Sequence, residues 1–240
     1  MHQIKFIFPT EKKNSLGYEC IIRTGLARAL KAGSVEKLKD LVKSNVFFQS
    51  ATDPSKQLVH TIEFLNREKI LNVEQFELLT SAIGEAMLNV NHHAYKCPLS
   101  NVQIHEKMQS IVSGIGERWW QCAWYDEDNR KWVFIIADLG LGIPFTYGFQ
   151  ANNVRRDDAP LSNLMKEAFT RGSSRFVGVG RGNGSENIKD AVGSNCRQQE
   201  SLLIYSGGVR YSYNTTQSEP KVIDLNQGIK GTLIEWTLYI

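Results

Sequence analysis

The sequence predicts an α+β protein, a two-layer α/β sandwich in which helices cover one face of a mixed, mostly antiparallel sheet. Helical patterns dominate the chain up to about residue 94, and strand patterns then follow, interrupted by a long glycine-rich stretch. Strands and helices do not alternate regularly, which excludes a doubly wound fold. We expect residues 71–240 to form the main domain. We expect residues 1–70 to form a helix-and-strand segment packed on it, because no linker separates the two parts.

The composition is that of an ordinary folded protein. Hydrophobic residues make up 42% of the 240 residues and charged residues 22%, and 28 basic residues against 25 acidic ones give a net charge of +3. This balance does not indicate a nucleic-acid partner, which needs a concentrated basic patch. No apolar run approaches the roughly 20 residues of a membrane span, and no signal peptide opens the chain, so we expect a cytoplasmic protein. The four cysteines lie far apart and predict thiols rather than a metal site.

Helical periodicity is clearest in residues 73–94, with Asn72 as the expected N-cap. The apolar positions of this segment recur every three or four residues and form one stripe that should face the core: Phe76, Leu79, Ile83, Met87 and Val90. Residues 26–42, broken at Gly33, and residues 55–67 are also helical in pattern, and residues 3–8 alternate like a short strand. We expect a polar loop after residue 94.

Strand patterns occupy most of the second half. Residues 119–125 and 132–137 flank a polar turn and predict a hairpin. The glycine-rich stretch from residue 139 to 184 holds one expected helix, near residues 161–169, and a second follows near 186–192. Three apolar segments at residues 202–205, 209–213 and 232–239 complete the expected sheet, with Gly207-Gly208 as a turn.

Three places in this framework carry groups suited to chemistry. On the long helix, Glu85, Asn89 and His93 are four residues apart and project from one side. A carboxylate and an amide in this arrangement can position a water and ligate a hard cation through oxygen. An ordinary polar helix face gives the same pattern, so Glu85 and Asn89 alone do not distinguish a functional site from a solvent-exposed helix face.

The second place is Asp138-Leu139-Gly140-Leu141-Gly142, at the end of an apolar strand. Asp138 could accept a hydrogen bond from an exocyclic amine such as that of adenine, and the glycines allow a flat ligand to approach the backbone. The third is Gly178-Val179-Gly180-Arg181-Gly182-Asn183-Gly184, directly before a helix. Glycines there could cradle a phosphate with backbone N–H groups. An ordinary turn and a flexible linker are the alternative readings.

In this order, and followed by Gly231-Thr232, the motifs resemble those of the GHKL ATPase superfamily, which includes DNA gyrase B subunits, large heat-shock chaperones, histidine kinases and MutL. Residues 85–94 resemble the N box, residues 138–143 the G1 box, residues 180–184 the G2 box, and Gly231-Thr232 the last motif. Residues 169–175 are similar to the mobile lid of kinase-like members. The resemblance covers about residues 73–240 and implies a Bergerat-type ATP-binding fold.

The resemblance also implies roles for individual residues, with ATP and Mg²⁺ as ligands. Asn89 would ligate Mg²⁺ and Glu85 would orient and deprotonate the attacking water or hydroxyl. Asp138 would hold the adenine amino group, with support from the nearby backbone and Thr232. The remaining implied nucleotide contacts lie in G1, the lid and G2: Gly140, Gly142, Arg171, Arg175, Gly180, Arg181, Gly182, Asn183 and Gly184.

The sequence departs from the superfamily pattern at two places, and the second of them bears on the predicted activity. Ser185 stands where many members have an apolar residue after G2. Residues 1–70 also lack the phosphoacceptor helix of sensor kinases, and His105 lies on an expected loop, so autophosphorylation on histidine is disfavoured.

Three functions remain open. The first is an ATP hydrolase in which lid closure acts as a conformational switch. The second is a serine/threonine protein kinase resembling bacterial anti-sigma factors, with a partner's hydroxyl as nucleophile. The third is a nucleotide-gated interaction module with little turnover. A protein partner or a homodimer, formed through the N-terminal segment, is expected in each case.

Overall fold

The computed structural model describes residues 47–97, 102–148, 159–170, 184–193 and 200–240. The predicted strand at residues 3–8 and the helical pattern at 26–42 lie outside these ranges. The described residues form an α+β structure, which confirms the predicted class.

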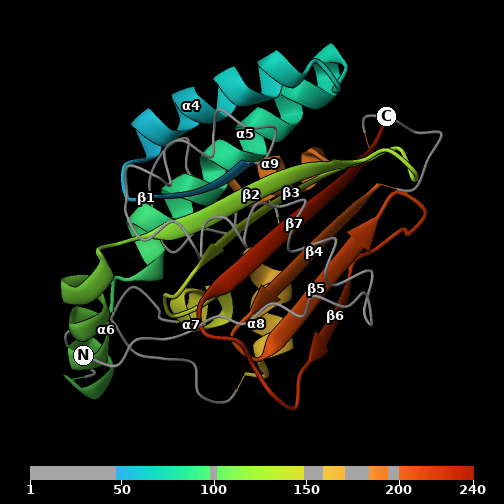
Figure 1. Cartoon of the computed structure of the whole chain (residues 1–240). Helices are drawn as coiled ribbons and strands as arrows, with labels where there is room; N and C mark the ends of the chain where they lie inside the picture. Colours follow the sequence, from blue (N-terminus) through green and yellow to red (C-terminus); the bar gives the residue numbers. More distant parts are fainter. Residues whose placement is uncertain (1–46, 98–101, 149–158, 171–183, 194–199) are drawn as a thin grey trace, which may run out of the picture.

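Seven strands form one sheet in the order β1-β2-β3-β7-β4-β5-β6 (Figure 1). Every pairing is antiparallel, so the expectation of a mixed sheet is wrong for the described residues. The strands are β1 (Phe47–Ala51), β2 (Trp119–Asp126), β3 (Lys131–Asp138), β4 (Ser201–Ser206), β5 (Val209–Asn214), β6 (Lys221–Asp224) and β7 (Thr232–Tyr239). The β2–β3 hairpin and the Gly207-Gly208 turn are as predicted, whereas β1 and β6, at the two edges, are not.

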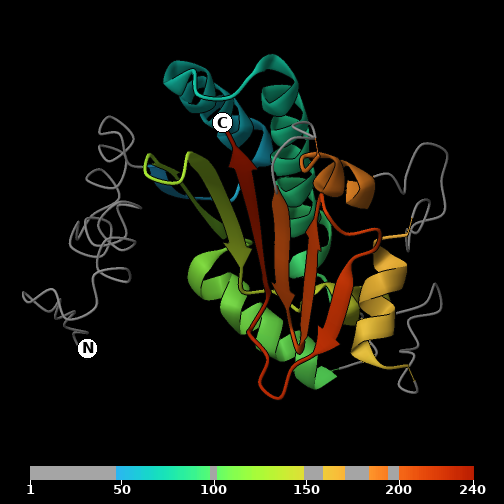
Figure 2. The ribbon, with the colours of Figure 1, turned by 90° about the vertical axis from the view of Figure 1, so that its right-hand side faces the viewer.

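The helices are α4 (Pro54–Glu68), α5 (Val73–Asn89), a π-helical turn η2 (Val90–Ala94), α6 (Val102–Ile115), α7 (Ile143–Gly148), α8 (Leu161–Ala168) and α9 (Gly184–Asp190). Most of the helices lie behind the sheet in the view of Figure 1, whereas α6 lies at the lower left, beyond the sheet, and Figure 2 shows the molecule turned by 90°. Helices α4, α5, α8 and α9 were expected, and α6 and α7 were not. The polar loop predicted after residue 94 is wrong, because Ile104, Met108 and Ile111 follow helical spacing and Met108 packs into the core.

Helix α5 begins at a complete capping box. The Asn72 side chain accepts a hydrogen bond from the Gln75 backbone N–H (2.9 Å), and the Gln75 side-chain oxygen accepts one from the Asn72 N–H (3.3 Å). The amide nitrogen of Gln75 also donates to Glu200 (3.0 Å) and to the Tyr239 carbonyl (2.8 Å), which fixes the start of α5 to the sheet.

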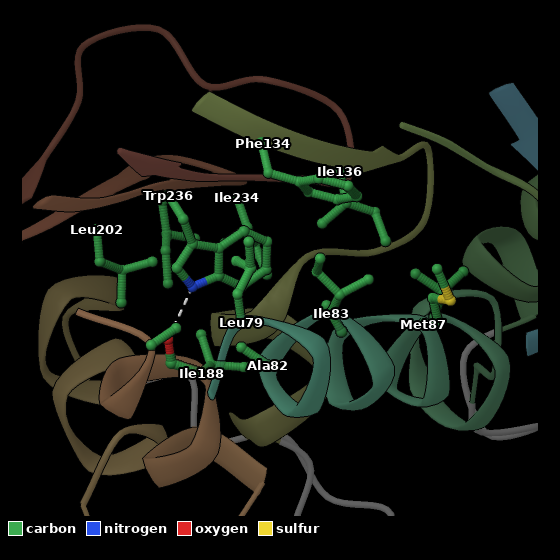
Figure 3. Close-up of a cluster of buried hydrophobic side chains, with 14 of the residues drawn as sticks. Leu79, Ala82, Ile83, Met87, Phe134, Ile136, Ile188, Leu202, Ile234 and Trp236 are labelled. Atoms are coloured by element: carbon green, nitrogen blue, oxygen red, sulfur yellow. Dashed lines mark hydrogen bonds between the residues drawn. The ribbon is translucent and has the colours of Figure 1, made fainter. Parts of the chain in front are cut away.

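The core lies between the helices and one face of the sheet, which we call the inner face (Figure 3). Leu79, Ile83 and Met87 of the predicted stripe are fully buried there, and each contributes about 1.5–3 kcal/mol by leaving water. The buried Trp236 indole donates to the Ile188 carbonyl (2.8 Å), so it ties α9 to β7. Together these contacts hold α5 and α9 side by side across the centre of the sheet.

Candidate functional site

Asp138 is the last residue of β3, on the inner face, and is only 7% exposed. One oxygen of its carboxylate accepts a hydrogen bond from the Gly140 N–H (2.7 Å). Burial raises the pKa of this carboxyl to about 6, against the opposing effect of backbone N–H donors at Gly140 and Thr232. At neutral pH the site therefore holds a desolvated, mostly ionised carboxylate.

The topology of the sheet explains why Thr232 lies beside Asp138. Strand β7 inserts between β3 and β4, with Ala137 opposite Leu233 and Ser206 opposite Thr232. The Thr232 and Ser206 hydroxyls are 2.9 Å apart and hydrogen-bonded, and the Ser206 oxygen also accepts from the Ile143 N–H (2.7 Å). Ser206 was not predicted as a site residue, although it is a polar residue at a buried position of an alternating strand.

Two positions next to Asp138 require glycine because a side chain would collide with the neighbouring backbone, and one of them also has a positive φ. A Cβ at Gly231 would lie well inside 3.0 Å of the Asp138 main-chain oxygen, and the φ of Gly231 is +78°. A Cβ at Gly140 would collide in the same way with the Ala94 carbonyl. These close approaches explain the glycines of the predicted G1 box and last motif in physical terms.

The loop after β3 is bonded to the end of the long helix. The Ala94 carbonyl accepts from the Leu141 N–H (2.7 Å), and the Tyr95 hydroxyl accepts from the Leu139 N–H (3.2 Å). Tyr95 donates in turn to the Arg118 carbonyl, and burial raises the pKa of its phenol to about 12. The chain segments that carry the predicted N box and G1 box are thus joined directly.

Glu85 and Asn89 lie on α5, both half-buried. Asn89 precedes Ala94 by five residues, which corresponds to about 7 Å along the helix axis from the loop contact. Asn89 lies seven residues, or about two helical turns, after Ala82, so the two side chains project from the same side of α5. Ala82 lies near Ile188 of α9 (Figure 3). Within the described residues, neither Glu85 nor Asn89 makes a side-chain hydrogen bond or ion pair.

The predicted phosphate-binding segment is only partly described. Gly184 opens α9, and the buried hydroxyl of Ser185 makes no hydrogen bond to any described residue. His93, in η2, packs edge-on against the His92 ring. The other predicted residues of the lid and G2 box lie outside the described residues: Arg171, Arg175, Gly180, Arg181, Gly182 and Asn183.

No cluster of three or more His, Cys, Asp or Glu side chains suited to a metal ion occurs in the part of the chain that the structure describes. Of the helices in the described ranges, none has the length and apolarity needed to cross a membrane.

No family model matches the chain, and no curated protein matches it.

Proposed function

We propose that the chain is a Mg²⁺-dependent ATP-binding protein with a Bergerat-type fold, that it hydrolyses ATP, and that nucleotide binding drives a conformational switch. The observation that carries the proposal is the Asp138 carboxylate, buried at a strand end among glycines that leave no room for a side chain. An ionised carboxylate has about four acceptor positions. Two backbone donors occupy part of them, and the remainder can accept from the exocyclic amine of adenine.

Thr232 and Ser206 support recognition of the base. Their linked hydroxyls lie at the strand ends next to Asp138 and can offer a donor or an acceptor to a polar edge of the ring. Since both side chains are buried and held in place, the polar groups are organised before any ligand arrives.

The helix side supplies groups for the phosphates. Asn89 offers an amide oxygen of the kind that Mg²⁺ accepts as a ligand, and the bound metal would neutralise phosphate charge. Glu85, one turn earlier on the same side of α5, would orient a water and accept its proton. The unpartnered Ser185 hydroxyl, in the first turn of α9, adds a polar group on the helix next to α5.

Calorimetric titration with a non-hydrolysable ATP analogue, with and without Mg²⁺, tests the binding site. Wild type should bind in a Mg²⁺-dependent manner and Asp138→Asn should lose most of the affinity, because the amide presents a donor in place of a carboxylate oxygen. Asp128→Asn, in the exposed β2–β3 turn, is the matched control and should bind normally. Equal binding by the Asp138 variant would refute the proposed role of Asp138.

Phosphate release and transfer of labelled phosphate to proteins of a cell extract then separate the three possible functions. Phosphate release by the purified protein supports the hydrolase. A labelled partner without release would favour the kinase, and tight binding with neither result would favour the interaction module.

A further inference from the structure

The face of the sheet opposite the core, which we call the outer face, is apolar in its central strands. Facing pairs place its side chains in rows across the strands. One row contains Ser50, Trp120, Ala137, Leu233, Tyr205 and Arg210, and the next contains Phe48, Cys122, Ile135, Glu235, Leu203 and Ser212. A third row contains Trp124, Val133, Thr237 and Ser201, and Val133 is only 7% exposed. The apolar side chains therefore gather in the middle of the face, and the polar ones stand mostly toward its edges.

A water-facing sheet surface does not have this composition. Antiparallel sheets with one solvated face alternate apolar and polar residues, whereas strands covered on both faces read as continuous apolar runs. Strand β3 is such a run, Trp132-Val133-Phe134-Ile135-Ile136-Ala137. The described helices α4, α5, α8 and α9 all lie on the inner side (Figures 1 and 2), so the sequence of β3 calls for a second layer that they do not provide.

The outer face carries one carboxylate near its centre. Glu235 stands between Ile135 and Leu203, half-buried, and burial raises the pKa of its carboxyl. Basic groups occur toward the rim: Lys131 at the end of β3, Arg210 on β5 and Lys221 on β6. Because Glu235 stands among apolar side chains and the basic groups lie at the rim, a covering segment should be apolar and should bring one basic group to Glu235 at the centre of the face.

Residues 1–46 meet these requirements. They join the sheet at Phe47, the first residue of edge strand β1, so they are tethered at the edge of the sheet, within reach of the outer face. They contain nine basic and four acidic residues, net +5, which leaves 19 basic and 21 acidic residues, net −2, in residues 47–240. The apolar positions within residues 26–42, at helical spacing, are Leu26, Leu30, Val35, Leu38, Leu41 and Val42.

The length of residues 26–42 also matches the width of the outer face. Seventeen helical residues extend at most about 25 Å. The five strands from β1 to β4 span about 19 Å at the usual strand spacing. We propose that residues 1–46 of the same chain dock on the outer face and form a second layer over β1, β2, β3, β7 and β4. Tethering supports this occupant over a second copy, since a short connection gives a high effective concentration.

Photo-crosslinking of the full chain tests this proposal. Benzoylphenylalanine replaces Trp124 on the outer face, or Leu203 as a second position in case the first variant folds poorly. The control places it at Val59, which is 53% exposed on α4, on the inner side of the sheet. Mixing ¹⁵N-labelled and unlabelled chains before irradiation distinguishes crosslinks within a chain from crosslinks between chains.

The expected result is a crosslink from position 124 or 203 to a peptide of residues 1–46 in the same chain, at least several-fold more abundant than from position 59. Crosslinks that join labelled to unlabelled chains would overturn the proposal in favour of a dimer interface. No crosslink from either outer-face position, in a variant that folds, would overturn it too.

Discussion

The two ends of the candidate site differ in how firmly the protein holds them. At the strand end, Asp138, Thr232 and Ser206 are buried, hydrogen-bonded and packed against glycines. On α5, Glu85 and Asn89 are half-buried, with no side-chain partner among the described residues. If the proposed function holds, the strand end is built in advance of the nucleotide, and Glu85 and Asn89 are the side chains left available to it. Substitutions should therefore alter stability at the first end and turnover at the second.

Glu85→Gln should give the largest effect. Loss of a general base costs about 10²–10⁴-fold in rate, so phosphate release should fall by this factor. The free energy of unfolding should change by less than about 0.5 kcal/mol, because the side chain has no described partner to lose. Release assays and denaturant unfolding measure the two quantities. A large loss of stability would contradict the contrast between the two ends.

Gly231→Ala should be the most damaging change at the strand end. The new Cβ would collide with the Asp138 main chain, and the positive φ adds strain, so we expect a loss of about 2–5 kcal/mol in unfolding free energy. Gly207→Ala is the matched control, because its φ is also positive (+55°) while nothing lies within 4 Å of the added Cβ. The control should lose only about 1–2 kcal/mol. Equal losses would mean that strain, rather than the close approach, sets the cost.

Asp138→Asn should stabilise the protein while removing nucleotide binding. The folded-state pKa of about 6 lies above the ordinary value of 3.8, so the native state binds the proton more tightly than the unfolded state. The contribution of the protonated Asp138 carboxyl to stability is present below about pH 4 and is lost as the pH rises through 6. At pH 7 the variant should therefore gain about 1–3 kcal/mol relative to wild type, and the gain should shrink toward pH 4. Thermal unfolding across this pH range measures it, and a destabilised variant at pH 7 would contradict the prediction.

The same titration should affect the ligand. Nucleotide affinity should fall as the pH drops below about 6, because the neutral acid offers fewer acceptor positions to an amine. Calorimetry at pH 5 and pH 7.5 checks this, and an affinity that is equal at the two pH values would contradict the role of the ionised Asp138 carboxylate.

Tyr95→Phe should give the smallest effect, about 1–2 kcal/mol. The substitution leaves the Leu139 N–H and the Arg118 carbonyl without their shared partner but creates no cavity. Because this hydroxyl joins the end of α5 to the loop after Asp138, the variant should also show faster amide exchange at Leu139. Unchanged exchange would show that the Ala94–Leu141 bond alone holds the two ends together.

Local signals in the sequence were enough for the parts of the fold that local physics determines. The long helix, its Asn72 cap and its buried stripe follow from spacing and capping chemistry, and the hairpin follows from two apolar runs around a polar turn. The short edge strands β1 and β6 were missed because four or five residues give too little pattern. Helix α6 was missed because its polar residues obscured three apolar positions at helical spacing.

Long-range pairing limited the prediction of the candidate site. Asp138 and Thr232 could each be singled out from a motif, but their proximity depends on β7 lying between β3 and β4, which no local pattern specifies. Ser206 enters the site only through that arrangement, since its hydroxyl meets Thr232 across the β4–β7 pair. The need for glycine at position 231 could not be explained from the sequence, because it arises from the close approach of the Asp138 backbone.

The position of β7 also has a consequence for how the protein folds. In the described sheet, strands β1 to β3 and strands β4 to β6 are two blocks joined by β7. The partners of β7 on β3 are about a hundred positions earlier in the chain, as in the Ala137–Leu233 pair. Until residues 232–239 emerge from the ribosome, β3 and β4 both present unpaired edges of the kind that template aggregation. Closing such a distant pairing is slow. During synthesis the chain is therefore prone to aggregate until β7 pairs with β3 and β4. A chaperone that binds the edges of β3 and β4 would protect the chain during this time.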